Sequence, residues 1–223
     1  VKPMVSSMDH KRALDHDEGL NTGGMGTVAP NPYYTPAVAE RCMQEIFLPT
    51  VAAMQAEGCP FKGCLYFGLM LTPDGPKVIE YNCRFGDPET QVVLPLLESD
   101  LLTVMEATTN GTLDKTDVKF SDGAAACVIL ASGGYPLAYE KGKEITGLTA
   151  GQLNAADVTV YHAGTAIKDG SLVTNGGRVL GVTATANTLP EALKKAYAAT
   201  ESIHFDKLHK RSDIGARALA AMQ

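Results

Sequence analysis

Several patterns that mark common functional classes are missing from this sequence. There is no excess of basic residues, since the 223 residues carry a formal net charge of −6, whereas a sequence-independent nucleic-acid binder needs a basic face. No apolar run approaches the roughly 20 residues of a membrane-spanning helix, and no secretory signal pattern is visible. We therefore expect no nucleic-acid partner and no membrane partner, and we expect a cytoplasmic protein.

Cysteine is also scarce and unpatterned. The five cysteines are odd in number and include no Cys-x-x-Cys pair: Cys42, Cys59, Cys64, Cys83 and Cys127. A disulfide framework and a zinc site both need paired cysteines at suitable spacing. The sequence therefore predicts reduced thiols and argues against zinc.

The pattern of residues before a polar stretch at 114–123 predicts a kinked helix, a hairpin and two further helical segments. The first of these two runs from Asp87 to about residue 98 and is interrupted at Pro95, and the second runs from Ser99 through residue 109. Apolar residues recur at helical spacing over residues 36–58, where Pro49 must kink or split the helix. Strands at 63–71 and 77–82 should pair antiparallel around a Pro-Asp-Gly turn. Residues 1–32 are predicted to be loop-like.

The pattern after the polar stretch predicts a compact β-rich domain with two helices. The expected strands cover residues 124–131, 143–146, 158–162, 172–174 and 178–185, and the expected helices begin near residues 188 and 214. With 223 residues, the chain can form one large or two small domains. We interpret it as an α+β protein.

Local signals predict where the helices begin. Ser, Thr and Asp favour the position just before a helix, and proline favours the first helical position. The expected caps are Thr35, Asp87, Ser99 and Thr188, the last forming a capping box with Glu191.

Two oxygen-bearing side chains on the strand at 77–82 are the candidate metal ligands. Glu80 and Asn82 are two residues apart, so they project from the same face of the strand. A carboxylate and an amide oxygen suit Mg²⁺, which also recruits water and substrate phosphates. Arg84 and Asp87 follow within a few residues. The pattern fits a site for phosphate chemistry or, equally well, a polar strand end with an ordinary helix cap.

A glycine-rich loop at residues 21–26 is a second candidate. Asn21, Thr22, Gly23 and Gly24 begin it, and glycines let a backbone approach a ligand and present N–H groups to an anion. The loop lacks the Gly-Lys-Ser/Thr ending of a P-loop. Nearby His10 is interpreted as structural.

Taken in order, the motifs of the chain resemble those of one enzyme family, the phosphoribosylamine–glycine ligases, also called glycinamide ribonucleotide synthetases. The motifs cover essentially the whole chain and are the segments at residues 9–12, 21–26, 80–91, 133–136, 162–165, 174–180 and 213–215. Each motif is weak alone, and their conjunction is specific.

The resemblance implies an ATP-grasp ligase of purine synthesis that uses ATP and Mg²⁺ or Mn²⁺. Its substrates would be glycine, which ATP converts to glycyl phosphate, and 5-phosphoribosylamine, whose amine then forms the amide. Glu80 and Asn82 match the metal ligands of the family. Arg84 and Asp87 match its catalytic, substrate-facing region, and residues 21–24 match its cofactor-binding loop.

The resemblance also implies that this is the carboxy-terminal portion of an enzyme about twice as long. The sequence begins at Val1 rather than Met, which favours a fragment. Residues 1–117 would be the later half of an ATP-grasp core with an antiparallel sheet, and residues 122–223 the small carboxy-terminal domain. We expect this portion to need the missing amino-terminal part as a partner and to be inactive alone. The alternatives are another ATP-grasp carboxylate–amine ligase and an inactive interaction module.

Overall fold

The computed structural model describes residues 1–148 and 157–223, which form two compact units. Unit 1 consists of Val1–Val5, Pro32–Gly86 and Leu97–Ser121, and unit 2 of Ser6–Asn31, Asp87–Leu96 and Asp122–Gln223. The units thus alternate along the chain, and the division into domains at 1–117 and 122–223 stays a prediction. In the described part of the chain, no helix has the length and apolar character to cross a membrane.

The expected kinked helix of unit 1 is present and is interrupted where proline requires it. Its segments are α1 (Pro36–Cys42), the π-helical η2 (Met43–Phe47) and α2 (Leu48–Ala56). Thr35 caps α1 as predicted, because its side chain accepts a hydrogen bond from Val38 N–H (3.4 Å). Pro49 cannot donate to the carbonyl group four residues earlier, and the wider π turn lies directly before it.

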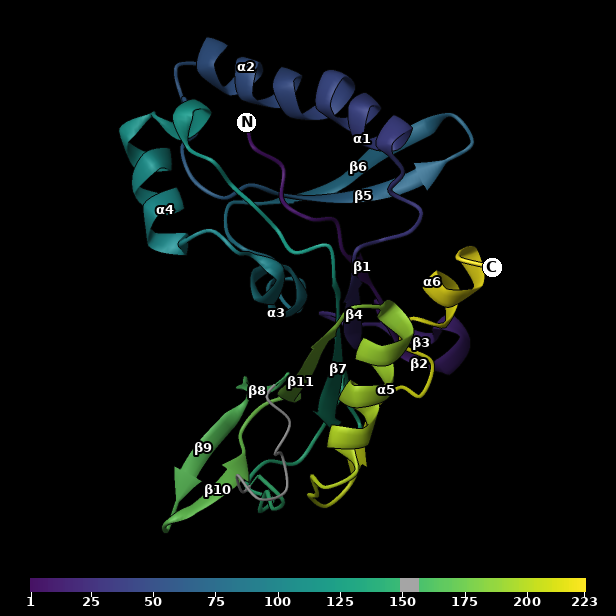
Figure 1. Ribbon diagram of the computed structural model, residues 1–223. Helices are drawn as coiled ribbons and strands as arrows, with labels where there is room; N and C mark the ends of the chain where they lie inside the picture. The colour runs from purple at the N-terminus through teal and green to yellow at the C-terminus, as the bar shows by residue number, and fades with distance from the viewer. Residues whose placement is uncertain (149–156) are drawn as a thin grey trace. The chain divides into compact units, whose positions relative to one another are not determined.

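The expected hairpin of unit 1 pairs β5 (Tyr66–Thr72) with β6 (Gly75–Asn82) in antiparallel register. The helix lies over one face of this hairpin (Figure 1). Their shared core consists of buried Cys42, Ile46 and Phe47, packed against Phe67, Leu69 and Val78. Burial of such side chains, each worth about 1.5–3 kcal/mol, holds the helix on the hairpin.

The remaining helix of unit 1, α4 (Leu101–Asn110), begins one residue later than expected. Asp100 caps it, since its Oδ1 accepts from Thr103 N–H (2.7 Å). The prediction of Ser99 as the cap was wrong, because the Ser99 hydroxyl instead accepts from Lys119 N–H (2.8 Å). Gly111 ends the helix in the left-handed conformation, with φ of 73°. The 3₁₀ turn η4 (Leu113–Lys115) follows.

Unit 2 is built on an antiparallel sheet whose strands come from distant parts of the chain. Its order is β1-β4-β7-β11-β8, with β12 also pairing with β7. The strands are β1 (Met8–Asp9), β4 (Gly26–Ala29), β7 (Ala124–Ser132), β8 (Val158–His162), β11 (Arg178–Ala186) and β12 (Leu208–His209). Every residue of β7 is buried, as expected for a strand covered on both faces.

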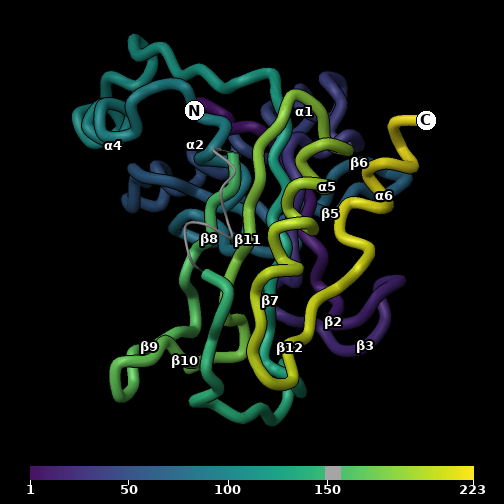
Figure 2. Tube along the Cα trace, turned by 60° about the horizontal axis from the view of Figure 1, so that its bottom comes forward, coloured from purple at the N-terminus to yellow at the C-terminus, as the bar shows by residue number. Residues whose placement is uncertain are grey.

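The helix α5 (Leu189–Thr200) covers one face of this sheet (Figures 1 and 2). Thr188 occupies its cap position, but no side-chain bond forms there, so the predicted capping box is absent. Outside the sheet, the described residues of unit 2 form two hairpins and four short helices. The hairpins are β2 (Arg12–Leu14) with β3 (Glu18–Asn21) and β9 (Thr165–Lys168) with β10 (Ser171–Thr174). The helices are η1 (Asp15–Asp17), α3 (Thr90–Val93), η3 (Leu94–Leu96) and α6 (Ala216–Ala221).

Two predictions of strand and loop positions were wrong in unit 2. The first 32 residues are not loop-like, since they contain β1 to β4, and β4 finds its partner β7 about a hundred residues later. Residues 143–146 form only isolated bridges, from Glu144 to Val173 and from Thr146 to His204. In both cases long-range pairing, rather than local propensity, decides the outcome.

All five cysteines are free thiols, as predicted. Cys42 and Cys127 are buried, and Cys59 and Cys83 are exposed. Burial raises the pKa of the Cys127 thiol to about 12 and makes that thiol unreactive at neutral pH.

Candidate functional site

The strand β6 presents Glu80 and Asn82 on the face that points away from the helix. The intervening Tyr81 points toward the helix: its ring centroid lies 5.4 Å from that of Phe67, and its hydroxyl lies 3.5 Å from Thr50 Oγ1. The register shift in the hairpin lies before Glu80, so alternation holds from residue 80 to 82. Glu80 is exposed and Asn82 is half-buried.

Gly68, opposite Glu80 on β5, lets the Glu80 side chain lie across the hairpin. A Cβ added to Gly68 would stand 2.7 Å from Glu80 Cγ, which is too close for an alanine. Within residues 1–148 and 157–223, no group of three or more His, Cys, Asp or Glu side chains could hold a metal. One carboxylate and one amide oxygen instead fit a cation that takes its other ligands from water and phosphate, which is the habit of Mg²⁺.

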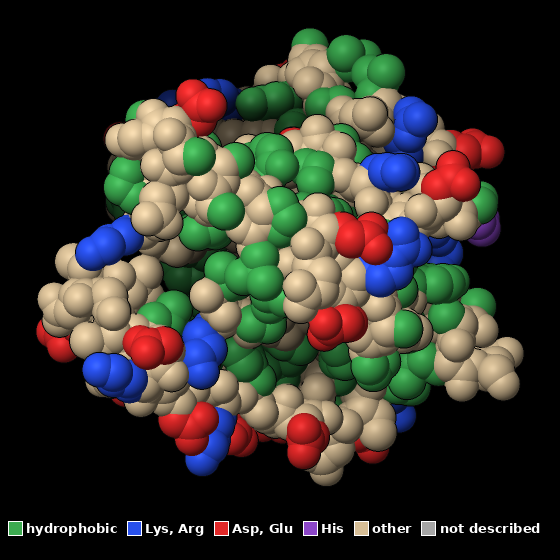
Figure 3. Space-filling model, turned by 90° about the horizontal axis from the view of Figure 1, so that it is seen from above, with side chains coloured by type: hydrophobic (Ala, Val, Ile, Leu, Met, Phe, Trp, Pro, Cys, Tyr) green, Lys and Arg blue, Asp and Glu red, His purple; other side chains and the backbone are tan. Residues whose placement is uncertain are grey.

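The helix side of the same hairpin holds an open pocket of about 570 Å³, lined by Glu45, Ile46, Pro49, Thr50, Ala53, Met54, Phe61, Leu65, Val78, Tyr81 and Cys83. Its lining is mainly apolar, and Tyr81 lines it, so the pocket lies on the opposite face of β6 from Glu80. The pocket is therefore separate from the candidate metal ligands. Hydrophobic side chains are also exposed at other places on the surface, as the space-filling view shows (Figure 3).

The structure places Arg84 and Asp87 in different units. Arg84, in unit 1, is exposed, and its Nη1 donates to the Phe85 carbonyl oxygen (2.9 Å). Asp87, in unit 2, is held at both carboxylate oxygens: Oδ1 accepts from Gln91 Nε2 (3.0 Å), and Oδ2 lies 3.3 Å from Arg178 Nη2. The prediction that Asp87 caps the next helix was wrong, because these partners engage its carboxylate, and Glu89 occupies the cap position of α3.

Four N–H groups of the glycine-rich loop, those of residues 22–25, are already engaged by the protein. Thr22 N–H donates to the Lys11 carbonyl oxygen (2.7 Å) and Met25 N–H to that of His10 (2.8 Å). Gly24 N–H donates to Thr22 Oγ1 (2.9 Å), and Gly23 N–H to the Tyr135 hydroxyl (3.0 Å). The expectation that the loop presents these N–H groups to an anion does not hold in this conformation. The binding role of Asn21, Thr22, Gly23 and Gly24 stays a prediction.

Gly24 brings the loop into contact with two other segments of unit 2. Its φ is +116°, and an added Cβ would stand 2.5 Å from Pro88 Cδ and 2.7 Å from Asp9 Oδ1. Only glycine fits this position. The loop therefore packs against the segment that carries Asp87.

The buried carboxylates of Asp9 and Glu89 form a charged cluster with the exposed Lys11 beside the loop. Asp9 Oδ2 lies 2.5 Å from Lys11 Nζ, which also lies 3.8 Å from Glu89 Oε1. Burial raises the pKa of Asp9 to about 6, although the Lys11 ammonium lowers it, and the Glu89 carboxylate raises it further. The ion pair of Asp9 with Lys11 is therefore weakened by protonation of Asp9 near pH 6.

Replacing Asp9 by Asn is expected to change how stability depends on pH. Because folding raises the pKa of Asp9, the resulting stabilisation is present in full below the ordinary value of 3.8 and is lost as pH rises through about 6. The free energy of unfolding of the wild type, relative to Asp9→Asn, should fall by about 2 kcal/mol between about pH 4 and 7. Urea unfolding followed by circular dichroism measures this, with the exposed Asp157→Asn as control. A difference that is constant across this range would contradict the prediction.

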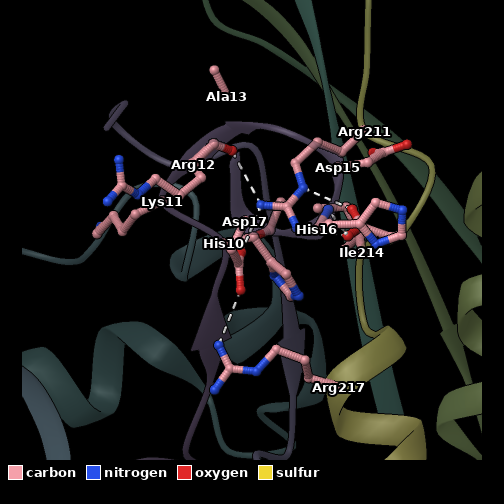
Figure 4. Close-up of polar contacts among 12 residues, drawn as sticks. His10, Lys11, Arg12, Ala13, Asp15, His16, Asp17, Arg211, Ile214 and Arg217 are labelled. Atoms are coloured by element: carbon pink, nitrogen blue, oxygen red, sulfur yellow. Dashed lines mark hydrogen bonds and ion pairs between the residues drawn. The ribbon is translucent and has the colours of Figure 1, made fainter. Parts of the chain in front are cut away.

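The motifs at residues 9–12 and 213–215 pack together around Arg211 (Figure 4). Only 1% of the Arg211 side chain is exposed, and its guanidinium pairs with Asp17 (3.0 Å) and Asp213 (2.8 Å). It also donates to the Arg12 carbonyl oxygen (3.1 Å). Burial by itself would raise the pKa of Asp17 and of Asp213, but the hydrogen bonds and the charge of Arg211 outweigh it, so both pKa values are lowered. Two motifs about 200 residues apart thus form one structural cluster.

His10 belongs to this cluster and has a structural role, as expected. Its Nε2 accepts from Gly215 N–H (3.0 Å), so Nδ1 carries the proton that it donates to the Gly26 carbonyl oxygen (3.1 Å). Burial lowers the pKa of His10, which keeps the ring neutral.

Two residues that the sequence did not single out contact the candidate residues of unit 2, Gly23 and Asp87. Arg178 and Tyr135 both bond to Gly23, and Arg178 also pairs with Asp87. Arg178 lies within the motif at residues 174–180 and Tyr135 within the motif at residues 133–136. Membership of these motifs was the only indication in the sequence that either residue could have a functional role. Nothing in the local pattern connects either motif with the glycine-rich loop.

Residues 1–90 match an ATP-grasp domain, and the fold of the chain is shared with solved structures. A crystal structure of biotin carboxylase from Campylobacter jejuni covers 84% of the chain with a TM-score of 0.58, and at 13% identity this likeness shows the fold alone. The model of the "Phosphoribosylglycinamide synthetase, ATP-grasp (A) domain" matches residues 1–90. The model of the C domain of the same synthetase matches residues 125–217. The chain belongs to the phosphoribosylglycinamide synthetase family.

Individual relatives agree with this assignment. The chain is 50% identical to phosphoribosylamine–glycine ligase of Vibrio vulnificus, over 100% of this chain and 52% of that protein. It is 49% identical to the trifunctional purine biosynthetic protein adenosine-3 of Gallus gallus, over 99% of this chain and 22% of that protein. The crystal structure of the ligase from Thermotoga maritima gives a TM-score of 0.83 at 40% identity, covering 95% of this chain and 51% of that one. The chain thus spans about half the length of these single-function relatives.

Proposed function

We propose that the full-length protein joins glycine to 5-phosphoribosylamine at the expense of ATP in the cytoplasm, as a step of purine synthesis. The observation that carries this proposal is the shared face of Glu80 and Asn82 on β6, within the segment that matches the ATP-grasp domain. The family relationship supplies the substrates, and Mg²⁺ or Mn²⁺ would be the metal. The chain spans about half the length of its single-function relatives, and a further, amino-terminal part would complete the enzyme.

The proposed reaction has two steps, phosphorylation of glycine and formation of the amide. A glycine carboxylate oxygen attacks the γ-phosphorus of ATP, which gives glycyl phosphate and ADP. The amine of 5-phosphoribosylamine then attacks the glycyl carbonyl carbon, phosphate leaves, and the amine loses a proton. Glu80 and Asn82 would hold a divalent cation, which would supply charge neutralisation at the phosphoryl oxygens.

Residues of this chain would hold and orient the reactants. Glu80 and Asn82 would offer their oxygens to the cation from one strand face, while Gly68 leaves space for the Glu80 side chain. Arg84, an exposed guanidinium, would pair with a substrate anion. Asp87, whose side chain is 49% exposed, would offer its carboxylate to a substrate ammonium or hydroxyl group.

Within unit 2, the loop of Asn21, Thr22, Gly23 and Gly24 would contact a substrate. Since the N–H groups of residues 22–24 are engaged by the protein, the contribution of the loop would come from the exposed Asn21 side chain and from the close approach that glycine permits.

The test is an assay of the purified full-length protein with Mg·ATP, glycine and 5-phosphoribosylamine. We expect ADP release to depend on glycine and on 5-phosphoribosylamine, and mass spectrometry to show the amide product. ADP release that needs a different carboxylate or amine would identify another ATP-grasp ligase. The absence of ADP release with any of these substrates would favour a protein that acts only through interactions.

A further inference from the structure

Three motifs from the second half of the chain meet at the start of β11. Gly164 lies against Gly176, since a Cβ added to Gly164 would stand 2.6 Å from Gly176 Cα. Gly164 N–H donates to the Arg178 carbonyl oxygen (2.9 Å), and Ser132 N–H to that of Gly177 (2.8 Å). Such close contacts between backbones require glycine. These contacts fix the backbone position of Arg178.

The Arg178 guanidinium connects the glycine-rich loop with Asp87. Its Nη1 donates to the carbonyl oxygens of Gly23 (2.8 Å) and Asp87 (3.0 Å), and its Nη2 lies 3.3 Å from Asp87 Oδ2. A Cβ added to Gly23 would stand 3.0 Å from Arg178 Cζ, so the guanidinium lies directly against this glycine. The Arg178 side chain is 20% exposed, which strengthens its charge interactions relative to a solvated pair.

Tyr135 binds the N–H group of Gly23, the residue whose carbonyl oxygen Arg178 binds. Its hydroxyl accepts from Gly23 N–H (3.0 Å). Its ring lies directly against Gly177, where an added Cβ would stand 2.2 Å from the ring. Both backbone groups of Gly23 are therefore bound by side chains from the second half of the chain.

We propose that Arg178 is a positioning residue of the ligation site, which holds the glycine-rich loop and Asp87 in one fixed arrangement, with Tyr135 as its support. The inference rests on the proposed function, because it is that function that assigns the loop and Asp87 to substrates. Arginine suits this role because its planar fork of five donors reaches two carbonyl groups and a carboxylate at once. A lysine would keep the charge but lose this geometry.

The experiment compares variants of the full-length enzyme. Arg178→Met is expected to lower kcat/KM for glycine about 100-fold, the cost of a displacement of about 1 Å at a reacting group. Arg178→Lys should lie between this variant and the wild type. Amide hydrogen exchange at residues 22–25 should accelerate in Arg178→Met. The matched control is Lys195→Met, which breaks an exposed ion pair of the same unit, Lys195 with Asp157 (2.7 Å), and should change neither readout.

A double-mutant cycle with Asp87→Asn separates positioning from general stability. If Arg178 acts through Asp87, the fold-loss caused by Arg178→Met should be smaller in the Asp87→Asn background. Equal losses in both backgrounds, or an Arg178→Met enzyme no worse than Lys195→Met, would overturn the inference. A wild-type enzyme without glycine-dependent ADP release would instead overturn the proposed function.

Tyr135→Phe covers the case in which Arg178→Met does not fold. This variant removes only the hydroxyl that accepts from Gly23 N–H, so it should accelerate exchange at Gly23 and lower kcat/KM. Unchanged exchange and unchanged kcat/KM would overturn the inference.

Discussion

In the full-length enzyme, Glu80→Gln and Asn82→Ala are each expected to lower Mg²⁺-dependent turnover about 100-fold or more. A cation on the migrating phosphoryl group is worth several kcal/mol to the transition state, and each 1.36 kcal/mol corresponds to a factor of about ten. Both side chains extend from the face of β6 opposite Tyr81, so neither contributes to the core between hairpin and helix. The fold should therefore survive both changes.

The measurement is ADP release against Mg²⁺ concentration, together with a thermal melt of each variant. Loss of a metal ligand should raise the Mg²⁺ concentration needed for half-maximal turnover, which a change elsewhere would not do. Glu106→Gln, an exposed change on α4 of the same unit, is the matched control and should behave as the wild type. Near-normal turnover of both site variants at limiting Mg²⁺ would remove Glu80 and Asn82 from the metal site.

The 223-residue portion by itself is expected to form no detectable amide product. It spans about half of the curated single-function relatives, and a phosphoryl-transfer enzyme works by holding nucleotide, metal and acceptor in fixed geometry. Loss of that positioning can forfeit roughly 7–11 kcal/mol. Two candidate metal ligands on one strand cannot replace it.

The assay supplies glycine, 5-phosphoribosylamine and Mg·ATP to the purified portion and follows ADP release. Its control is the full-length enzyme at the same concentration, and circular dichroism establishes that the portion is folded. Steady ADP release that depends on glycine would show that these residues hold a complete site.

The sequence by itself determined the features that depend on near neighbours. The β5–β6 hairpin, the cap at Thr35, the interruption at Pro49 and the strand β7 all follow from patterns within a few residues. The common face of Glu80 and Asn82 follows from strand alternation alone. The order of the motifs also indicated the family, which the comparisons confirm.

The tertiary structure alone decided how distant segments meet. The sequence treated the first 32 residues as loop, because β4 is stabilised by β7 rather than by its own neighbours. It placed Asp87 as a helix cap, but Arg178, 91 residues further on, takes its carboxylate. It expected open N–H groups at Gly23, which Tyr135 in fact binds.

The physical reason is the range of each interaction. Caps, turns and strand alternation are fixed by steric and hydrogen-bonding rules that act over a few residues, so they can be deduced from the sequence. A polar group that folding buries must find a partner, but which partner it finds depends on how the strands pair and pack. The sequence therefore supplied the candidate ligands, and the packing of unit 2 determined which side chains hold the loop and Asp87 in place.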